Sequence, residues 1–114
     1  ASATYDAGAF VGGIIRRYSP GAAFTDCTPT ATNIVGAIPG AVVNQSFLTI
    51  IANLGSGLMT LGAGTGVTLV GTTTIGSEQA RLLLGQVTGS AAVTLSNIFA
   101  WNIGTGGTQV AGLN

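Results

Sequence analysis

Residues 80–103 read ARLLLGQVTGSAAVTLSNIFAWNI, and this stretch decides the fold. Its first eight residues alternate between two faces, one of which carries Leu82, Leu84 and Gln86. The TGS in the middle is a turn signal, and the rest alternates again, with one parity shared by Val93, Leu95, Phe99, Trp101 and Ile103. The pattern predicts two half-buried strands, and the second is either one strand or two strands with a break near Asn97.

The same pattern continues toward the N-terminus, where short β-branched and aromatic runs are separated by glycine-rich turns. The expected strands cover residues 46–53, 58–61, 67–70 and 72–75. We expect the first two to pair as a hairpin, and a bend at Gly71 to separate the last two. Turn signals at this spacing, without helices between them, predict an all-β fold, an antiparallel β-sandwich of jelly-roll type. At 114 residues, the chain reads as one domain over residues 1–114.

One segment differs from the rest. Residues 28–40 read TPTATNIVGAIPG, with Thr28 as a helix N-cap, Pro29 at the first helical position and a Pro-Gly stop. This predicts one short lid helix around residues 29–38, over an open end of the sandwich. Residues 1–9 and 104–114 carry no apolar pattern, so we expect them to be flexible arms.

Charge is scarce throughout the chain. Charged residues make up 5% of the sequence, against about 25% in an ordinary domain, and the net charge is zero. The six are Asp6, Arg16, Arg17, Asp26, Glu78 and Arg81. Such a chain lies in a membrane, is covered by other protein chains, or stays soluble on its Thr, Ser, Asn and Gln side chains alone. Because no apolar run approaches the roughly 18 residues of a spanning helix, we expect no membrane partner and favour the second explanation.

The sequence holds few of the residue types that catalysis or ligand binding requires. Histidine is absent and the three acids lie in separate segments, so we expect no enzyme and no catalytic residues. Scattered carboxylates and the single Cys27, read as a buried thiol, match no metal-ligand spacing. The glycines of residues 62–66 lack the Lys-Ser/Thr of a phosphate loop, so no cofactor is expected. Three arginines are too few for a nucleic-acid partner.

We expect most of the charged side chains to form ion pairs. Arg16 and Arg17 point to opposite faces if they lie in a strand, so one is expected to pair with Asp26 or Glu78 and the other to cross an interface. Glu78 and Arg81 are expected to form a solvated pair around a turn.

Five segments carry a family resemblance: AAFTD (22–26), TPTATNIVGAI (28–38), VNQSF (43–47), MTLGAGTGVTL (59–69) and GTTTI (71–75). In this order they resemble small virion proteins of tailed bacteriophages. Related modules are capsid decoration (cement) proteins and domains of head or tail fibres. The resemblance implies a non-enzymatic, all-β homotrimer on the capsid surface of the virion, with the major capsid protein or another virion protein as partner. The family pattern carries more charge than this chain.

Two sets of contact residues are expected. The subunit interface is predicted on the last aromatic strand, at Phe99, Trp101 and Ile103. Contact with the shell is predicted near the N-terminus, at Tyr5, Phe10, Val11, Arg16 and Arg17.

Three other functions compete with a decoration protein. A fibre or pilus subunit would donate its glycine-rich tail as a strand to a neighbour. An ice-binding protein would use threonines such as Thr72 and Thr74, although a regular ice-facing array needs that unit repeated. A sugar-binding module would stack its ligand on Phe99 and Trp101.

Overall fold

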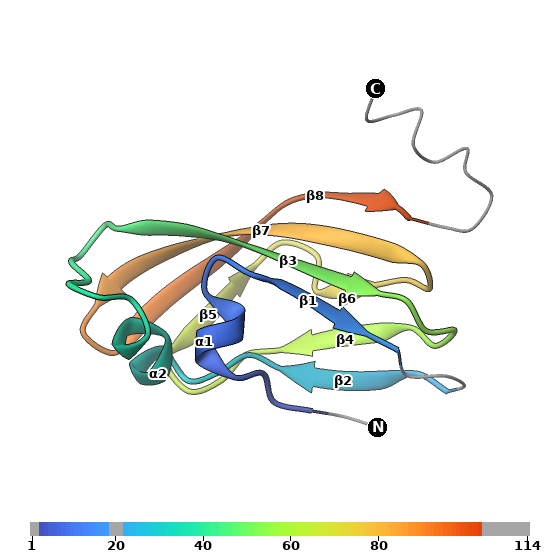
Figure 1. Cartoon of the computed structure of the whole chain (residues 1–114), viewed down its shortest axis with the longest axis horizontal. Helices are drawn as coiled ribbons and strands as arrows, with labels where there is room; N and C mark the ends of the chain where they lie inside the picture. The colour runs from blue at the N-terminus through green and yellow to red at the C-terminus, as the bar shows by residue number, and fades with distance from the viewer. Residues whose placement is uncertain (1–2, 19–21, 104–114) are drawn as a thin grey trace.

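Two short helices and eight strands make up the part of the chain that the structure describes, residues 3–18 and 22–103 of a computed structural model (Figure 1). The helices are α1 (Ala7–Phe10) and α2 (Ala31–Gly36). The strands are β1 (Ile14–Arg17), β2 (Phe24–Cys27), β3 (Ser46–Asn53), β4 (Met59–Gly62), β5 (Val67–Val70), β6 (Thr74–Ile75), β7 (Gln79–Gly89) and β8 (Ala92–Asn102). The fold is thus mostly β, as the sequence predicts. The expected arm at 104–114 lies outside the described residues.

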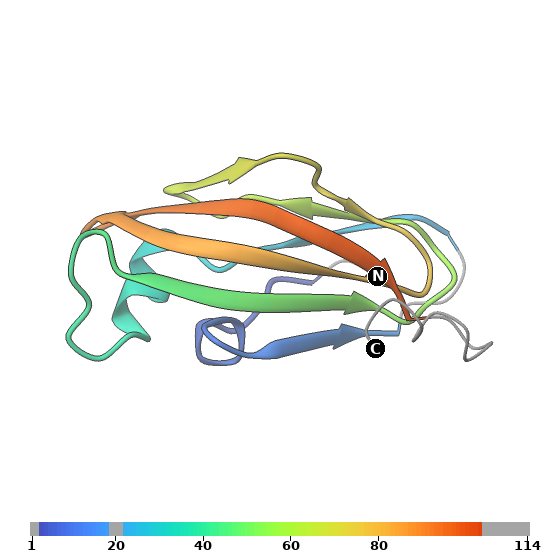
Figure 2. The same cartoon turned by 90° about the horizontal axis from the view of Figure 1, so that it is seen from above.

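The strands form two sheets. One has five strands in the order β1-β3-β7-β8-β5, and the other has three in the order β2-β4-β6. Figure 2 shows the five strands side by side, with the three-stranded sheet behind them. The pairs β1–β3, β5–β8 and β2–β4 are parallel. The prediction of a purely antiparallel fold is therefore wrong, because long excursions of the chain, rather than tight turns, join these pairs.

The predicted hairpin between residues 46–53 and 58–61 is also wrong. Strand β3 pairs with β1 and β7, whereas β4 belongs to the other sheet. Strand β3 therefore occupies an interior position of the five-stranded sheet, with a neighbour on each side. The bend expected at Gly71 is confirmed: this glycine has a φ of +94° and separates β5 from β6, which lie in different sheets.

One core lies between the sheets and the helices. It draws apolar side chains from the facing sides of both sheets, since side chains alternate along each strand. Its fully buried members include Phe10, Ile34, Ile51, Met59, Ile75, Val87, Val93 and Leu95. Figure 1 places α2 at one end of the molecule and α1 nearer its middle, and both helices contribute to this core.

The lid helix is shorter than predicted. Helix α2 begins at Ala31, and its N-cap is Thr30, whose side chain accepts a hydrogen bond of 3.2 Å from the Asn33 amide. Thr28, the expected cap, is buried instead. Its hydroxyl donates to the Pro29 carbonyl and accepts from the Gly64 amide at 2.8 Å, which fastens the segment before α2 to the loop after β4.

The N-terminal segment is built into the fold. The Tyr5 amide donates to the Cys27 carbonyl at 3.0 Å, and the Cys27 amide donates to the Ala3 carbonyl at 2.8 Å. Tyr5 and Phe10 are buried, and Asp6 caps α1. The prediction of a flexible arm is therefore wrong for residues 3–9. The only large apolar residues in this part of the sequence are Tyr5 and Phe10, five positions apart. That spacing matches neither the two-residue repeat of a strand nor the repeat of a helix, so the sequence pattern does not predict their burial.

A β-bulge divides β8. Leu83 pairs with Asn97 and Leu82 with Phe99, so Ile98 is an extra residue between them. The insertion reverses which parity faces the core: Val93 and Leu95 point inward, whereas Phe99 is 48% exposed. Strand β8 is therefore one strand with a bulge next to Asn97, where the sequence allows a break, and the prediction that all five apolar residues share one face is wrong.

Candidate functional site

Exposed apolar side chains gather on the outer face, by which we mean the side of the five-stranded sheet that points away from the three-stranded sheet. Alternation and register place the following residues there: Ile14, Arg16, Ser46, Leu48, Ile50, Ala52, Thr68, Val70, Ala80, Leu82, Leu84, Gln86, Thr94, Ser96, Phe99 and Trp101. The outer side of a sheet that is open to water normally carries polar side chains. The apolar character of this face therefore needs an explanation.

Two apolar rows cross the outer face. Register aligns Ile14, Ile50, Leu82 and Phe99 across four strands, and the next row holds Leu48, Leu84, Ser96 and Val70. Ile14 is 65% exposed, Leu48 52% and Val70 50%. The rings of Phe99 and Trp101 lie 5.2 Å apart at a tilt of 42°, which adds an aromatic pair at the end of the first row.

Polar residues border these rows. Ser46, Gln86, Thr94 and Thr68 form the adjoining row at one end. Arg16 lies at the edge strand β1 beyond the other end, and it is the only charged residue that the described part of the chain places on this face. An apolar centre with a polar row at one end and a single charge at the far edge resembles the apolar core and polar rim of surfaces that bind protein.

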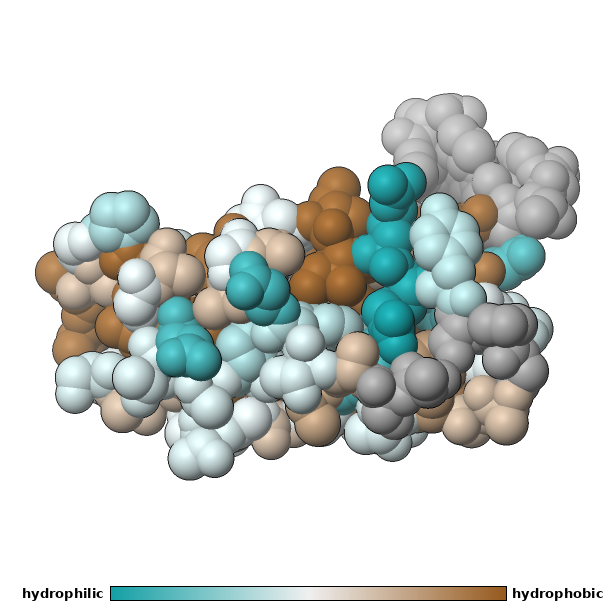
Figure 3. Space-filling model, turned by 60° about the horizontal axis from the view of Figure 1, so that its bottom comes forward, coloured by the Kyte–Doolittle hydropathy of each residue, from teal (hydrophilic) through white to brown (hydrophobic). Residues whose placement is uncertain are grey.

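The rest of the surface is weakly polar. Figure 3, which brings the underside of Figure 1 forward, shows mostly pale surface with a few teal areas and several brown areas, one of them beside a teal strip. Exposed apolar residues away from the outer face include Tyr18, Val42, Val43 and Leu58. They lie in three separate segments outside the strands, with Val42 and Val43 sharing one of them, in contrast to the aligned rows of the outer face.

Two of the three predicted interface residues lie together on the outer face. Phe99 is half exposed and Trp101 is half-buried beside it. Ile103 follows the end of β8, where its amide donates to the Glu78 carbonyl at 2.8 Å. Whether these residues contact another subunit stays a prediction.

The five predicted shell-contact residues do not form one surface. Tyr5 and Phe10 are buried in the core, so their proposed contact with a shell is wrong for this fold. Val11 packs against the core, and Arg17 turns inward to Asp26. Only Arg16 is exposed. The tandem arginines do point to opposite faces, as the sequence predicts for a strand.

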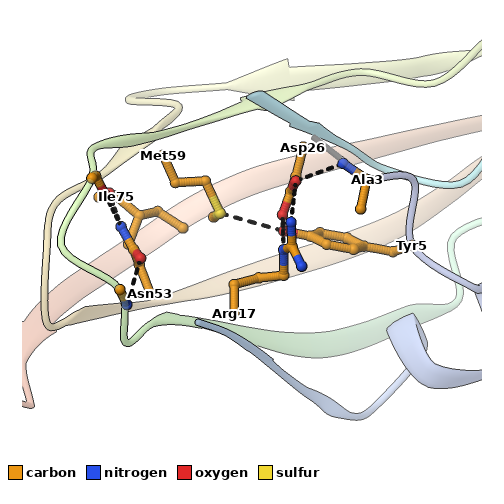
Figure 4. Close-up of polar contacts among 9 residues, drawn as sticks. Ala3, Tyr5, Arg17, Asp26, Asn53, Met59 and Ile75 are labelled. Atoms are coloured by element: carbon orange, nitrogen blue, oxygen red, sulfur yellow. Dashed lines mark hydrogen bonds and ion pairs between the residues drawn. The ribbon is translucent and has the colours of Figure 1, made fainter. Parts of the chain in front are cut away.

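A buried polar cluster joins the two sheets to the N-terminal segment (Figure 4). The Asp26 carboxylate on β2 is 0% exposed, and it accepts from the Ala3 amide at 2.9 Å and from the Tyr5 hydroxyl at 2.8 Å. Arg17 on β1 donates to it through Nε at 2.5 Å and Nη2 at 3.1 Å. The hydrogen bond to Asp26 raises the pKa of Arg17, and burial together with Asp26 raises the pKa of Tyr5. Since no substrate reaches a fully buried carboxylate, we assign this cluster to structure.

Two further polar side chains link the sheets. Asn53 on β3 donates to the Gly57 and Ile75 carbonyls at 2.8 and 3.0 Å. Arg81 on β7 donates to the Thr74 carbonyl of β6 at 2.8 Å. The prediction of a solvated pair between Arg81 and Glu78 is wrong, because Arg81 is buried, and this burial lowers its pKa.

The described residues offer little support for a metal site, a membrane-spanning helix, a buried thiol or a threonine array. These hold no group of three His, Cys, Asp or Glu placed to bind a metal, and no helix with the length and apolarity needed to cross a membrane. Cys27 is a free thiol and is half-buried rather than buried. Thr74 lies in β6 but Thr72 precedes it, so the two threonines do not form a strand array.

The sequence missed most of the outer face. It identifies the face shared by Leu82, Leu84 and Gln86, but residues 46–53 are apolar at both parities, so the pattern does not single out Leu48 and Ile50 as outward. The bulge at Ile98 also conceals that Phe99 joins them. Comparisons with protein families, with curated proteins and with solved structures found no match to this chain.

Proposed function

We propose that this chain is a non-enzymatic structural protein whose outer face is covered by protein in its working state. The observation that carries the proposal is the pair of apolar rows on that face, in a chain with six charged residues out of 114. Burial of apolar area, rather than ion pairing, would supply the free energy of association, at roughly 25 cal/mol per Å². Such binding tolerates high salt, since salt screens exposed charges and leaves apolar burial intact.

The working state that we propose is a virion. The resemblance of residues 21–95 to decoration and fibre proteins of tailed bacteriophages supports this, and it implies a homotrimer on the capsid surface that bridges or stabilises capsid subunits. Two sheets around one core support the finer fold of a β-sandwich related to jelly rolls. Many weak apolar contacts, repeated by the symmetry of a shell, become strong together through effective concentration.

Immunogold electron microscopy tests this proposal. Particles are collected from cultures of the organism or phage that encodes the chain, and are labelled with an antiserum raised against the purified protein. We expect gold on the capsid surface, and the chain in the protein content of particles purified by density gradient. Absence of the chain from the particles, with normal expression in the culture, would refute a virion role.

A further inference from the structure

We propose that the occupant of the outer face is a second copy of this chain, packed sheet to sheet around a two-fold axis that runs along β7. This inference names the partner of the face that the proposed function leaves open. It also replaces the trimer implied by the resemblance with a two-fold pair, for which the geometry of the face gives three reasons.

The first reason is size. At about 3.4 Å per residue and about 4.8 Å between strands, each strand residue covers roughly 16 Å² of a sheet. The lengths of the five strands then give the outer face about 600 Å². Each partner of a stable interface buries about 600–1,000 Å². One sheet face therefore suffices, provided that most of it is covered at once, and a second flat sheet covers it most fully.

The second reason is the position of β7, which is the middle strand of five. A two-fold axis along β7 lays β8 of one copy over β3 of the other and keeps each row opposite its own counterpart. Phe99 then meets Ile50 of the second copy, and Leu82 and Leu84 meet their own symmetry mates. Trp101, the largest side chain of the face, comes opposite Ala52, which leaves room for its ring.

The third reason is charge. A self-complementary surface must not bring like charges together, and an off-centre charge avoids this because the two-fold axis carries it to the far side. Arg16 satisfies the condition, since it lies on edge strand β1, two strands away from β7. The uncharged rows on β3, β7 and β8 offer nothing that would select a charged partner instead.

The first experiment uses the unmodified protein. Trp101 is the single tryptophan of the chain and lies on the outer face, so its emission reports whether that face is wet. We expect a dimer by native mass spectrometry and light scattering at about 100 μM, and a red shift of emission on dilution below the dissociation constant. A monomer at that concentration, or a trimer, would overturn the proposal.

Two matched variants test the surface used. Leu48→Glu places a charge on the outer face, whereas Leu58→Glu makes the same change at a residue of similar exposure, 52% against 47%, outside this face. Both side chains are half exposed, so both variants should fold, which circular dichroism checks. We expect Leu48→Glu to weaken dimerisation by about 100-fold or more, and Leu58→Glu to leave it unchanged. Equal effects of the two would overturn the proposal.

A cross-link tests the axis, in a Cys27→Ser background. A thiol introduced by Leu84→Cys lies across the interface from its symmetry mate, at about the 10 Å spacing of packed sheets, so a short bismaleimide cross-linker should give a covalent dimer. A thiol introduced by Val70→Cys on edge strand β5 lies far from its mate and should not. The reverse pattern would refute the axis along β7. A monomeric chain that is nonetheless found on particles would refute this inference and leave the proposed function standing. A dimer that is absent from particles would support this inference and refute the proposed function.

Discussion

Replacing Asp26 with asparagine should destabilise the fold strongly. The side chain keeps its shape, but the negative charge and one acceptor oxygen are lost. In the native cluster, four donor contacts reach the carboxylate: the Ala3 amide, the Tyr5 hydroxyl and two from Arg17. The new NH₂ group can donate to the Tyr5 oxygen if that hydroxyl turns. The same NH₂ group, however, points at an N–H donor of Arg17, so that contact becomes repulsive.

The cost follows from these contacts. Breaking a buried ion pair by neutralising one partner costs about 3–5 kcal/mol. Arg17 is 24% exposed and can turn toward water, so we expect the lower end of that range, about 3 kcal/mol. At roughly 4 °C per kcal/mol for a chain of this size, the melting temperature should fall by about 12 °C.

The assay is urea unfolding followed by circular dichroism at pH 7, with all variants at one protein concentration because association shifts apparent stability. Asp6→Asn is the matched control. Asp6 caps α1 at the exposed surface, and asparagine caps a helix as well as aspartate does, so little should change. If Asp26→Asn and Asp6→Asn lowered stability equally, the view that Asp26 joins the sheets would be refuted.

Two further substitutions probe the core. Tyr5→Phe should cost about 1 kcal/mol at neutral pH. It should also flatten the loss of stability above about pH 10, because unfolded Tyr5 releases its proton near 10.0 whereas the folded state, with its raised pKa, retains it. Urea midpoints at pH 7, 10 and 11 measure this, and equal alkaline slopes in both proteins would contradict it. Gly85→Ala should destabilise by about 1–3 kcal/mol, because a Cβ there would overlap the ring of Phe47. Gly36→Ala, which has open space, should instead be neutral or stabilising, and thermal melts compare the two.

The sequence predicts local structure better than strand partners. Glycine spacing and β-branched runs identify strands 67–70 and 80–87 and the bend at Gly71, because these depend on neighbours along the chain. The pairing of β1 with β3 is not predictable in this way. It joins residues more than thirty positions apart, and short four-residue strands carry too few side chains to specify a partner.

For the outer face, too, the local pattern is predictable from the sequence, whereas the arrangement in space is not. The parity of Leu82 and Leu84 is correct from the pattern, but the pattern cannot say which side of a strand faces the core when both sides are apolar. In β3, Ile51 is buried and Leu48 is half exposed, although both are aliphatic. Charge scarcity indicates that some face is covered, whereas identifying the face required the register.

The bulge at Ile98 connects the core to the outer face. A regular β8 would keep Phe99 and Trp101 on the same side as Val93 and Leu95, against the three-stranded sheet. That inner side already contains Arg81 and Asn97, and part of it is closed by the short strand β6. The extra residue moves the two aromatic rings outward, where they align with β3 and β7. The bulge is thus the feature that supplies the aromatic end of the outer face. Deleting Ile98 should then return Phe99 to the inner side, lower the free energy of unfolding and abolish dimerisation. A deletion variant that remained both stable and dimeric would show that dimerisation does not depend on the bulge.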